Sequence, residues 1–138
     1  MNSLTVKDVA HIAFVLAREM LTFHEPIPDF STRYPHRLES CLATPFLGFE
    51  GKSLYPSLVE KASILFYLMI KNHPFQNGNK RIAMTTFFIF LNRNGKWLRV
   101  DRQKLYNFAK WVAASDPEVK NATVAAIEEF LRRYMVNG

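Results

Sequence analysis

Two long apolar stretches, residues 58–71 and 81–95, constrain the fold more than any other feature of this chain. Apolar side chains nearly encircle each stretch at helical spacing, which predicts helices that are buried on most sides. Ser57 and Glu60 form the S-x-x-E capping box that starts such a helix. The polar sequence NHPFQNGNKR at 72–81 joins the two stretches. The sequence therefore predicts two central buried helices connected by one polar loop.

Shorter helical patterns surround this pair. A capping-box-like start at Thr5 predicts a first helix that ends near Thr22, and Asp101 and Asp116 are expected to cap two later helices. The expected helical ranges are 5–22, 36–44, 57–71, 81–95, 102–114 and 118–135. The chain shows no internal repeat and no interdomain linker, so we expect a single domain over residues 1–138.

The segment PFLGFEGKSLYP at 45–56 breaks the helical pattern. Aromatic residues alternate with glycines there and a proline stands at each end, which favours a small β-hairpin or an extended flap. Such a flap exposes backbone hydrogen-bonding groups. The expected architecture is an all-α helical bundle with a small β-hairpin flap just before the central helix–loop–helix.

Cysteine content and hydropathy indicate where the chain works. Cys41 is the single cysteine, so it cannot form an internal disulfide, and no secretory signal opens the sequence. The longest nearly uncharged run, ASILFYLMI, is about half of the roughly 20 residues that a membrane helix needs. These features predict a cytoplasmic protein without a membrane segment.

The charge balance favours an anionic ligand or partner. Eighteen Lys and Arg against twelve Asp and Glu give a formal charge of +6, which suits a nucleotide, a nucleic acid or an acidic protein segment. The cations are scattered along the helices without a recognition-helix or aromatic-sheet signature, which argues against nucleic-acid binding. One cysteine and no histidine pair at metal spacing exclude a structural zinc site.

The polar loop carries the residues with the clearest chemistry. Gly78 lets backbone N–H groups approach a ligand, and we expect the amides of residues 77–80 at the N-terminus of the second central helix. Unpaired N–H groups and the helix dipole attract anions there, and Lys80 and Arg81 add two formal charges. The sequence of the loop therefore predicts a binding site of the size of a phosphate group.

His73 stands at the mouth of this loop. Pro74 disfavours a helical conformation for the residue before it, which keeps His73 out of the helix. An imidazole beside a bound phosphate can take the proton of an incoming hydroxyl, and Phe75 is expected to anchor the loop in the core. A polar turn between helices with cations after it is also common as a purely structural feature, so the residues alone leave both interpretations open.

The stretch HPFQNGNKR at 73–81 resembles the core motif of the Fic/Doc family, H-P-F-x-D/E-G-N-G/K-R. LTVKDVAHI at 4–12 and RLESCLATP at 37–45 also resemble the death-on-curing branch of that family, and the resemblance extends over residues 4–100. It implies an all-α fold whose motif loop binds ATP with Mg²⁺. Part of the ATP is then moved to a hydroxyl of a target protein.

The resemblance also implies a role for each matching position. His73 would be the general base and Phe75 the buried anchor. The implied nucleotide and phosphate ligands are Asn77, Gly78, Asn79, Lys80 and Arg81. The flap would hold a segment of the target protein as an added strand. Its implied docking residues are Gly48, Phe49, Gly51, Lys52 and Leu54.

Asn77 departs from the family pattern, which has a metal-holding acid at this position. An amide oxygen is neutral and binds Mg²⁺ more weakly than a carboxylate, so Asn77 is expected to be a weak metal ligand. Met84 replaces a second arginine of many AMP-transferring members, and Gly78 is typical of those members, whereas Lys80 is typical of the death-on-curing branch. Transfer of AMP, as in most Fic enzymes, and transfer of the terminal phosphate, as in the death-on-curing toxin, both stay open.

Control of the activity and its loss are two further questions that the sequence raises. The self-inhibitory pattern of the family, Ser/Thr-x-x-x-Glu-Gly/Asn, is absent from the chain. We therefore expect restraint by a separate antitoxin with an acidic or disordered tail that suits the basic surface. The alternative to a toxin-like transferase is a catalytically impaired module that still binds a nucleotide or a protein, because Asn77 replaces the acid.

Overall fold

The computed structural model describes residues 1–20 and 26–138. Its α-helices are α1 Val6–Asp8, α2 Phe14–Met20, α3 Pro35–Ala43, α4 Leu58–Lys71, α5 Asn79–Arg93, α6 Arg102–Ala114 and α7 Lys120–Tyr134. Shorter helical turns are the π-helical η1 Val9–Ala13 and the 3₁₀ turns η2 Phe30–Thr32, η3 Thr44–Phe46 and η4 Pro117–Val119. The strands are β1 Gly48–Phe49, β2 Lys52–Ser53, β3 Lys96–Leu98 and β4 Met135–Asn137.

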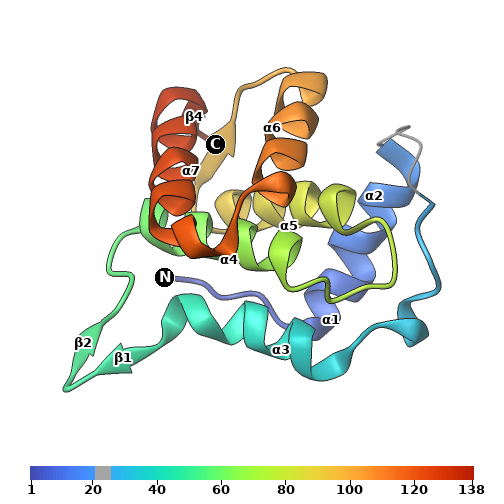
Figure 1. Cartoon of the computed structure of the whole chain (residues 1–138), viewed down its shortest axis with the longest axis horizontal. Helices are drawn as coiled ribbons and strands as arrows, with labels where there is room; N and C mark the ends of the chain where they lie inside the picture. The colour runs from blue at the N-terminus through green and yellow to red at the C-terminus, as the bar shows by residue number, and fades with distance from the viewer. Residues whose placement is uncertain (21–25) are drawn as a thin grey trace.

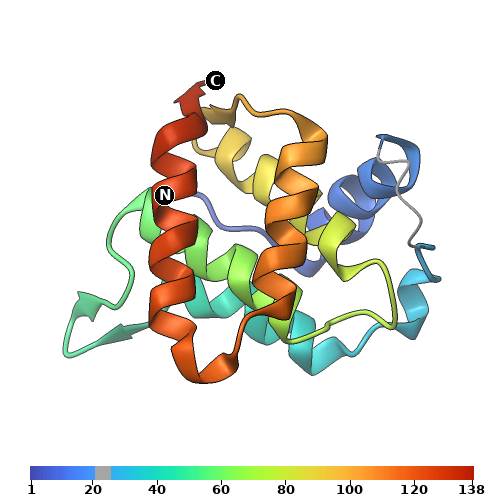
Figure 2. The same cartoon turned by 45° about the horizontal axis from the view of Figure 1, so that its top comes forward.

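The helices α4 and α5 occupy the centre of the bundle, as the apolar patterns predict (Figure 1). Every residue of α4 from 61 to 70 is buried, and so are most residues of α5 up to Leu91. The rings of Phe66 in α4 and Phe87 in α5 lie 4.6 Å apart, centroid to centroid. The remaining helices cover this pair, which confirms the all-α expectation (Figure 2).

Local capping explains where several helices begin. The Ser57 hydroxyl accepts a hydrogen bond from the Glu60 amide at 3.1 Å and donates one to the Glu60 carboxylate at 2.9 Å. Thr5 and Asp8 form the reciprocal capping box at the start of α1, with distances of 2.8 and 3.1 Å. The Thr5 box satisfies two backbone amides, whereas the Ser57 cap satisfies one, because the Glu60 carboxylate bonds to the Ser57 hydroxyl and not to the Ser57 amide. Both helix starts follow from local chemistry.

The first helix is not the regular α-helix that its pattern predicts. Its middle, Val9–Ala13, is π-helical, and the Phe14 amide bonds to the Val9 carbonyl. The Thr85 hydroxyl of α5 donates to the Ala13 carbonyl at 2.7 Å. The expected end near Thr22 lies outside the described residues. A backbone carbonyl of this segment thus bonds to a buried hydroxyl from another helix. Sequence periodicity cannot indicate such a long-range contact.

The C-terminal segment also differs from the expected helix over 118–135. α7 ends at Tyr134, and β4 then pairs antiparallel with β3, with Leu98 opposite Met135. The Arg99 amide donates to the Tyr134 carbonyl at 2.8 Å and extends this pairing. The two strands are far apart in the sequence and no turn signal joins them, so the pattern gave no sign of this sheet.

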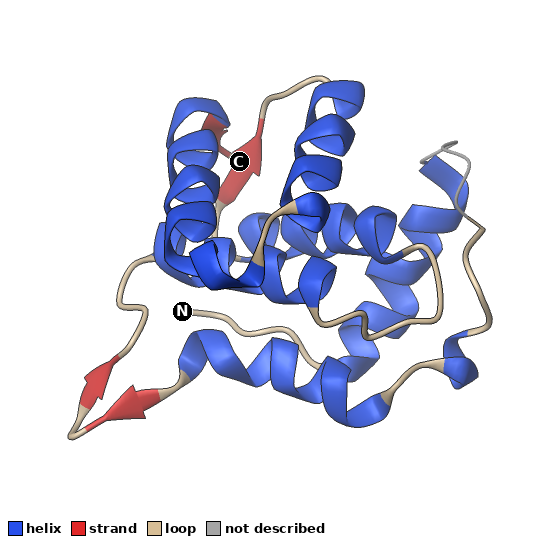
Figure 3. Cartoon of the chain, viewed as in Figure 1, coloured by secondary structure: helices blue, strands red, loops and turns tan. Residues whose placement is uncertain are grey.

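The hairpin predicted before α4 is present, and it projects from the helical body (Figure 3). Gly48 pairs with Ser53 and Phe49 with Lys52, and the tip is turned by Glu50 and Gly51, whose φ angles are 51° and 76°. All four strand residues are exposed. No helix within 1–20 or 26–138 has both the length and the hydropathy of a membrane span.

Candidate active site

The motif loop, residues 72–78, connects the end of α4 to the start of α5. Gly78, with a φ of 71°, is the N-cap, so α5 begins at Asn79, earlier than the expected start at 81. The Gly78 carbonyl accepts from the Ile82 amide at 3.0 Å, the first backbone bond of this helix. The amides of residues 79–81 therefore lie at the positive end of the α5 dipole, one to two residues later than the 77–80 that the sequence predicts.

Glycine is required at position 78 for two reasons. Its left-handed φ of 71° is strained for any residue with a Cβ. A Cβ there would also lie 2.6 Å from Cδ1 of Ile27 and 3.1 Å from the Pro26 carbonyl oxygen. The segment 26–27 thus packs directly on Gly78, so the glycine serves a protein contact as well as the expected approach of a ligand.

Asn79 clamps the motif loop from inside. Its side chain is buried, with an exposed fraction of 7%. The side-chain oxygen accepts from the Phe75 amide at 3.0 Å, and the side-chain nitrogen donates to the Phe75 carbonyl at 2.9 Å. These bonds fix the orientation of the amide and hold the loop against the first turn of α5. Asn79 therefore acts on the backbone of the loop in this structure.

Phe75 fills the space beneath the loop. Its ring is 1% exposed, and its centroid lies 5.6 Å from that of Phe14 and 5.9 Å from that of Phe30. Burial of a phenyl ring in an aromatic cluster stabilises a loop far more than one surface contact does. The loop is therefore fixed by a buried ring and by the Asn79 bonds together.

His73 adopts a strained backbone conformation at the mouth of the loop. Its φ is 46°, in the left-handed region, which costs a non-glycine residue about 1–3 kcal/mol. The His73 carbonyl accepts from Arg37 at 3.4 Å, and the Pro74 carbonyl accepts from the Tyr34 amide at 2.8 Å. Strain of this kind persists where surrounding contacts maintain it, and it is concentrated at functional sites.

Arg37 and Tyr34 are residues that the sequence did not reveal as neighbours of His73. The Arg37 guanidinium lies 4.3 Å from the centre of the Tyr34 ring, and both side chains are exposed. The contact to His73 spans 36 positions in the chain, so no local pattern could signal it. It adds a cation to the mouth of the loop, at the His73 backbone carbonyl.

The His73 ring lies beside the Asn79 clamp. The Asn79 side-chain nitrogen is 3.4 Å from Nδ1 of His73. A separation of 3.4 Å is at the long limit for a hydrogen bond, so this contact orients the exposed ring without fixing which ring nitrogen carries the proton.

Asn77 occupies the position where the family pattern has an acid. Its side chain is exposed, and its oxygen accepts a hydrogen bond from the Gly78 amide at 2.8 Å. The amide at 78 is therefore already satisfied, and a phosphate would bind the later amides or displace Asn77. Within the described chain no cluster of three or more His, Cys, Asp or Glu residues could hold a metal ion.

The two cations of the motif lie in different surroundings. Lys80 is half-buried in the first turn of α5. Arg81 is 6% exposed, and its guanidinium donates to the Ala17 carbonyl of α2. One positive charge is thus at the rim of the loop, and the other is held in the interior beneath it.

Cys41 in α3 lies against the start of the loop. Burial raises the pKa of its thiol to about 12, and a hydrogen bond with the Asn72 side chain lowers the pKa by less than burial raises it. The thiolate is the reactive form of cysteine. Cys41 is therefore a packing residue at neutral pH.

The structure does not bring the hairpin to the motif loop. The hairpin precedes the first turn of α4 and the loop follows its last turn, and both views show them at opposite ends of that helix. At 1.5 Å per residue, the 14 residues of α4 separate the two by about 20 Å. The implied docking residues at positions 48–54 therefore form a second location, remote from His73.

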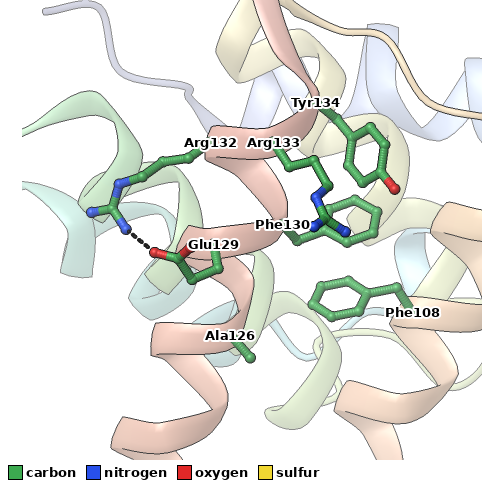
Figure 4. Close-up of a pocket in the computed structure, with 7 residues that line it drawn as sticks. All are labelled: Phe108, Ala126, Glu129, Phe130, Arg132, Arg133 and Tyr134. Atoms are coloured by element: carbon green, nitrogen blue, oxygen red, sulfur yellow. Dashed lines mark hydrogen bonds and ion pairs between the residues drawn. The ribbon is translucent and has the colours of Figure 1, made fainter.

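A surface cavity of about 520 Å³ lies between α6 and α7, and it shares no residue with the motif loop (Figure 4). The Arg132 guanidinium and the Glu129 carboxylate pair across 2.9 Å at its edge. The lining residues are Phe108, Ala126, Glu129, Phe130, Arg132, Arg133 and Tyr134. None of the residues implied by the motif contributes to this cavity.

Comparison with known proteins identifies the family of the chain. The chain is 36% identical over 64 residues to "Toxin Doc" of Mycolicibacterium smegmatis, which is 46% of this chain and 49% of that protein. The match thus spans about half the length of the relative. No solved structure matches the chain. The sequence profile of the Fic/DOC family matches residues 3–91, including the whole motif loop, and the chain therefore belongs to the Fic/Doc family.

Proposed function

We propose that the protein is a toxin-like Fic/Doc transferase that uses ATP to modify a hydroxyl of a target protein. The observation that carries this proposal is the strained His73, held with a φ of 46° beside the start of α5. A base at this position faces the helix end that attracts phosphate. The match to a toxin over 46% of the chain supports the same activity.

The proposed reaction assigns a role to each of these groups. His73 takes the proton of the target hydroxyl, and the hydroxyl oxygen then forms a bond to a phosphorus atom of ATP. Attack at the α-phosphorus releases pyrophosphate and leaves AMP on the target, whereas attack at the γ-phosphorus releases ADP and leaves a phosphate. The amides of residues 79–81 and Lys80 stabilise the negative charge on the phosphoryl oxygens.

Mg²⁺ would neutralise charge on the phosphates when it is bound. The motif loop has no carboxylate for it, and the neutral Asn77 oxygen already accepts from the Gly78 amide. The donor set of the loop therefore fits a metal poorly. No step described here depends on the ion.

ATP labelled separately at the α- and γ-phosphorus tests the proposal and decides between the two reactions. Purified protein is incubated with each label and with bacterial extract as a mixture of targets. Protein-bound α-label indicates AMP transfer, and protein-bound γ-label indicates phosphate transfer. Label bound from neither position, with or without Mg²⁺, would exclude the transferase.

His73→Ala and His73→Asn should both abolish labelling. Asparagine tolerates the left-handed conformation that His73 adopts, but it cannot act as a base at neutral pH. His73→Asn therefore tests the loss of the base alone, because it leaves the backbone conformation at position 73 unchanged. Thermal unfolding by circular dichroism should show that it melts close to the wild type, and labelling retained by it would remove His73 as the base.

The second candidate function is a binding module that has lost chemistry. The specific observation in its favour is the Asn77 side chain, which lacks the negative charge of an acid and is bonded to the Gly78 amide. Asn77→Asp keeps an oxygen for that bond and adds a carboxylate for Mg²⁺. If the wild type binds ATP without turnover in calorimetry and Asn77→Asp restores Mg²⁺-dependent labelling, this second function is correct.

We further propose that a separate antitoxin restrains the protein and that both are cytoplasmic. The basic charge of +6 suits an acidic or disordered antitoxin segment. Expression in bacteria with and without the product of an adjacent gene tests this proposal. Growth arrest that persists when the two proteins are co-expressed would contradict it.

A further inference from the structure

We propose that Lys61 is a positioning residue that holds the hairpin 47–54 as a docking element for the target protein. The use of the hairpin for docking rests on the proposed function, whereas the role of Lys61 in holding it does not. Lys61 is in the second turn of α4, at the hairpin end of that helix, and is only 6% exposed.

The ammonium of Lys61 contacts β2 of the hairpin and the chain on both sides of it. Nζ donates to the Pro45 carbonyl at 3.1 Å, on the chain before β1. It also donates to the Ser53 hydroxyl at 3.0 Å, within β2, and to the Tyr55 carbonyl, on the chain after β2. A lysine ammonium has three donors, so these three acceptors use all of them.

The hairpin itself has few internal restraints, and the chain on either side of it packs on the body through the buried Pro45, the Phe46 ring, whose centroid is 6.1 Å from that of Phe90, and the half-buried Tyr55. Its strands are two residues long and exposed, and the Leu54 amide closes their base by donating to the Leu47 carbonyl at 3.0 Å. Isolated two-stranded hairpins are marginally stable in water at best. The buried ammonium therefore adds directed bonds that set the orientation of this hairpin, beside the packing of its flanks.

Packing alone does not explain a lysine at this position. A buried charge is costly unless it is hydrogen-bonded, and an apolar side chain of similar volume is often at least as stabilising. The ring of Phe46, 5.1 Å from Nζ, would pack equally well on a methionine. What the ammonium adds is a set of directed bonds that specify one arrangement of β2 and the chain on both sides of the hairpin.

This arrangement fixes the distance between the docking element and the chemistry. α4 spans the 14 residues 58–71, so the hairpin base and the loop of His73 are held about 20 Å apart. A segment that engages both must be at least about six extended residues long, or belong to a folded domain of that size. The structure thus favours a target segment of at least about six residues, or a folded domain, over a shorter peptide that carries only the hydroxyl.

Hydrogen exchange measured by mass spectrometry tests the role of Lys61 without any activity. Lys61→Met should increase exchange in peptides covering 46–55 by about tenfold or more, because three charge-assisted bonds are lost. Peptides from α5 should be unchanged, and the exposed Lys7→Met serves as the matched control. Exchange of 46–55 within about twofold of the wild type in a folded Lys61→Met would overturn the proposal.

A second variant covers the case in which Lys61→Met does not fold. Ser53→Ala removes one acceptor on the exposed hairpin and should raise exchange of 46–55 by about threefold. Lys61→Arg retains charge and donors and should restore most of the protection. Unchanged exchange in Ser53→Ala, in the absence of a folded Lys61→Met, would also overturn the proposal.

Labelling kinetics test the docking role. With bacterial extract as the protein substrate and labelled ATP, Lys61→Met should raise the apparent KM for protein by about tenfold or more and change kcat by less. Unaltered kinetics in a variant with a loosened hairpin would show that the hairpin does not dock the target. If the wild type transfers no label, the proposed function fails, and the exchange experiment still decides the role of Lys61.

Discussion

The two ends of α4 carry different kinds of structure. At the C-terminal end, the loop 72–78 is held by a buried aromatic ring, by the two Asn79 bonds and by contacts from α3. At the N-terminal end, the hairpin residues are exposed and one lysine joins β2 and the chain on both sides of the hairpin to the helix. The loop is therefore packed as part of the core, whereas the hairpin lies on the surface and is joined to α4 by Lys61.

This difference matches what each end would have to do. Groups that act on a reacting atom must be held to within a fraction of an ångström, which requires packing and internal hydrogen bonds. A surface that meets another protein tolerates more freedom and needs exposed apolar and backbone groups. Substitutions at the two ends should therefore differ in their cost to stability.

The largest expected contrast is between two phenylalanines. Phe75→Ala should lower the free energy of unfolding by about 3–5 kcal/mol, because it removes a buried ring from the core. Phe49→Ala, at a residue that is 69% exposed on the hairpin, should change it by no more than about 0.5 kcal/mol. Urea unfolding followed by circular dichroism measures both. Equal costs would show that the hairpin is also part of the core.

Two glycines with left-handed backbones sharpen the same contrast. Gly78→Ala should cost about 2–3 kcal/mol, from the conformation and from the clash with Ile27. Gly51→Ala at the hairpin tip has a similar φ, 76°, and no atom within 4 Å of the added Cβ, so only the conformational cost of about 1 kcal/mol applies. Thermal melts of the two variants isolate the contribution of the Ile27 contact, and equal shifts would rule it out.

Cys41 provides a pH-dependent measure of the loop end. Its thiol pKa is about 12 in the folded protein against an ordinary 9.0, so ionisation favours the unfolded state once the pH exceeds 9. Stability should be unaffected by this group below pH 9 and should fall by about 1.4 kcal/mol per pH unit between pH 9 and 12. Urea unfolding at pH 8, 9 and 10 measures this slope.

Cys41→Ala is the control for that slope, because other groups also titrate in alkali. The difference between wild type and variant should be constant below pH 9 and should shrink above it. A difference that stays constant to pH 10 would mean that the thiol is less buried than the structure places it. Rapid modification of the thiol at pH 8 would indicate the same.

Features that depend on local chemistry were predictable from the sequence. The helix start capped by Ser57, the hairpin with its glycine turn and the polar break between two apolar helices all arise from neighbouring residues. The composition of the motif loop, a polar segment between two apolar helices, likewise indicates a special role from the sequence alone. These parts of the fold agree with the pattern because few long-range contacts are needed to form them.

Features that depend on packing were not predictable. The π-helical turn at 9–13, the pairing of β3 with β4, and the contacts of Arg37 and Tyr34 with the motif loop join distant parts of the chain. Within the site, the sequence suggested that Gly78 serves a ligand, and it did not indicate the Ile27 contact. One sequence contains no record of which distant segments touch, so such contacts require the structure.

The spacing imposed by α4 also bears on engineering. Because the proposed recognition at the hairpin and the proposed chemistry at His73 belong to separate segments at either end of one helix, each could be exchanged without redesigning the other. Residues 47–54 of a related protein could replace those of this chain, with Lys61 kept to hold the new hairpin. Such a chimera would be a direct way to redirect the protein toward a different target.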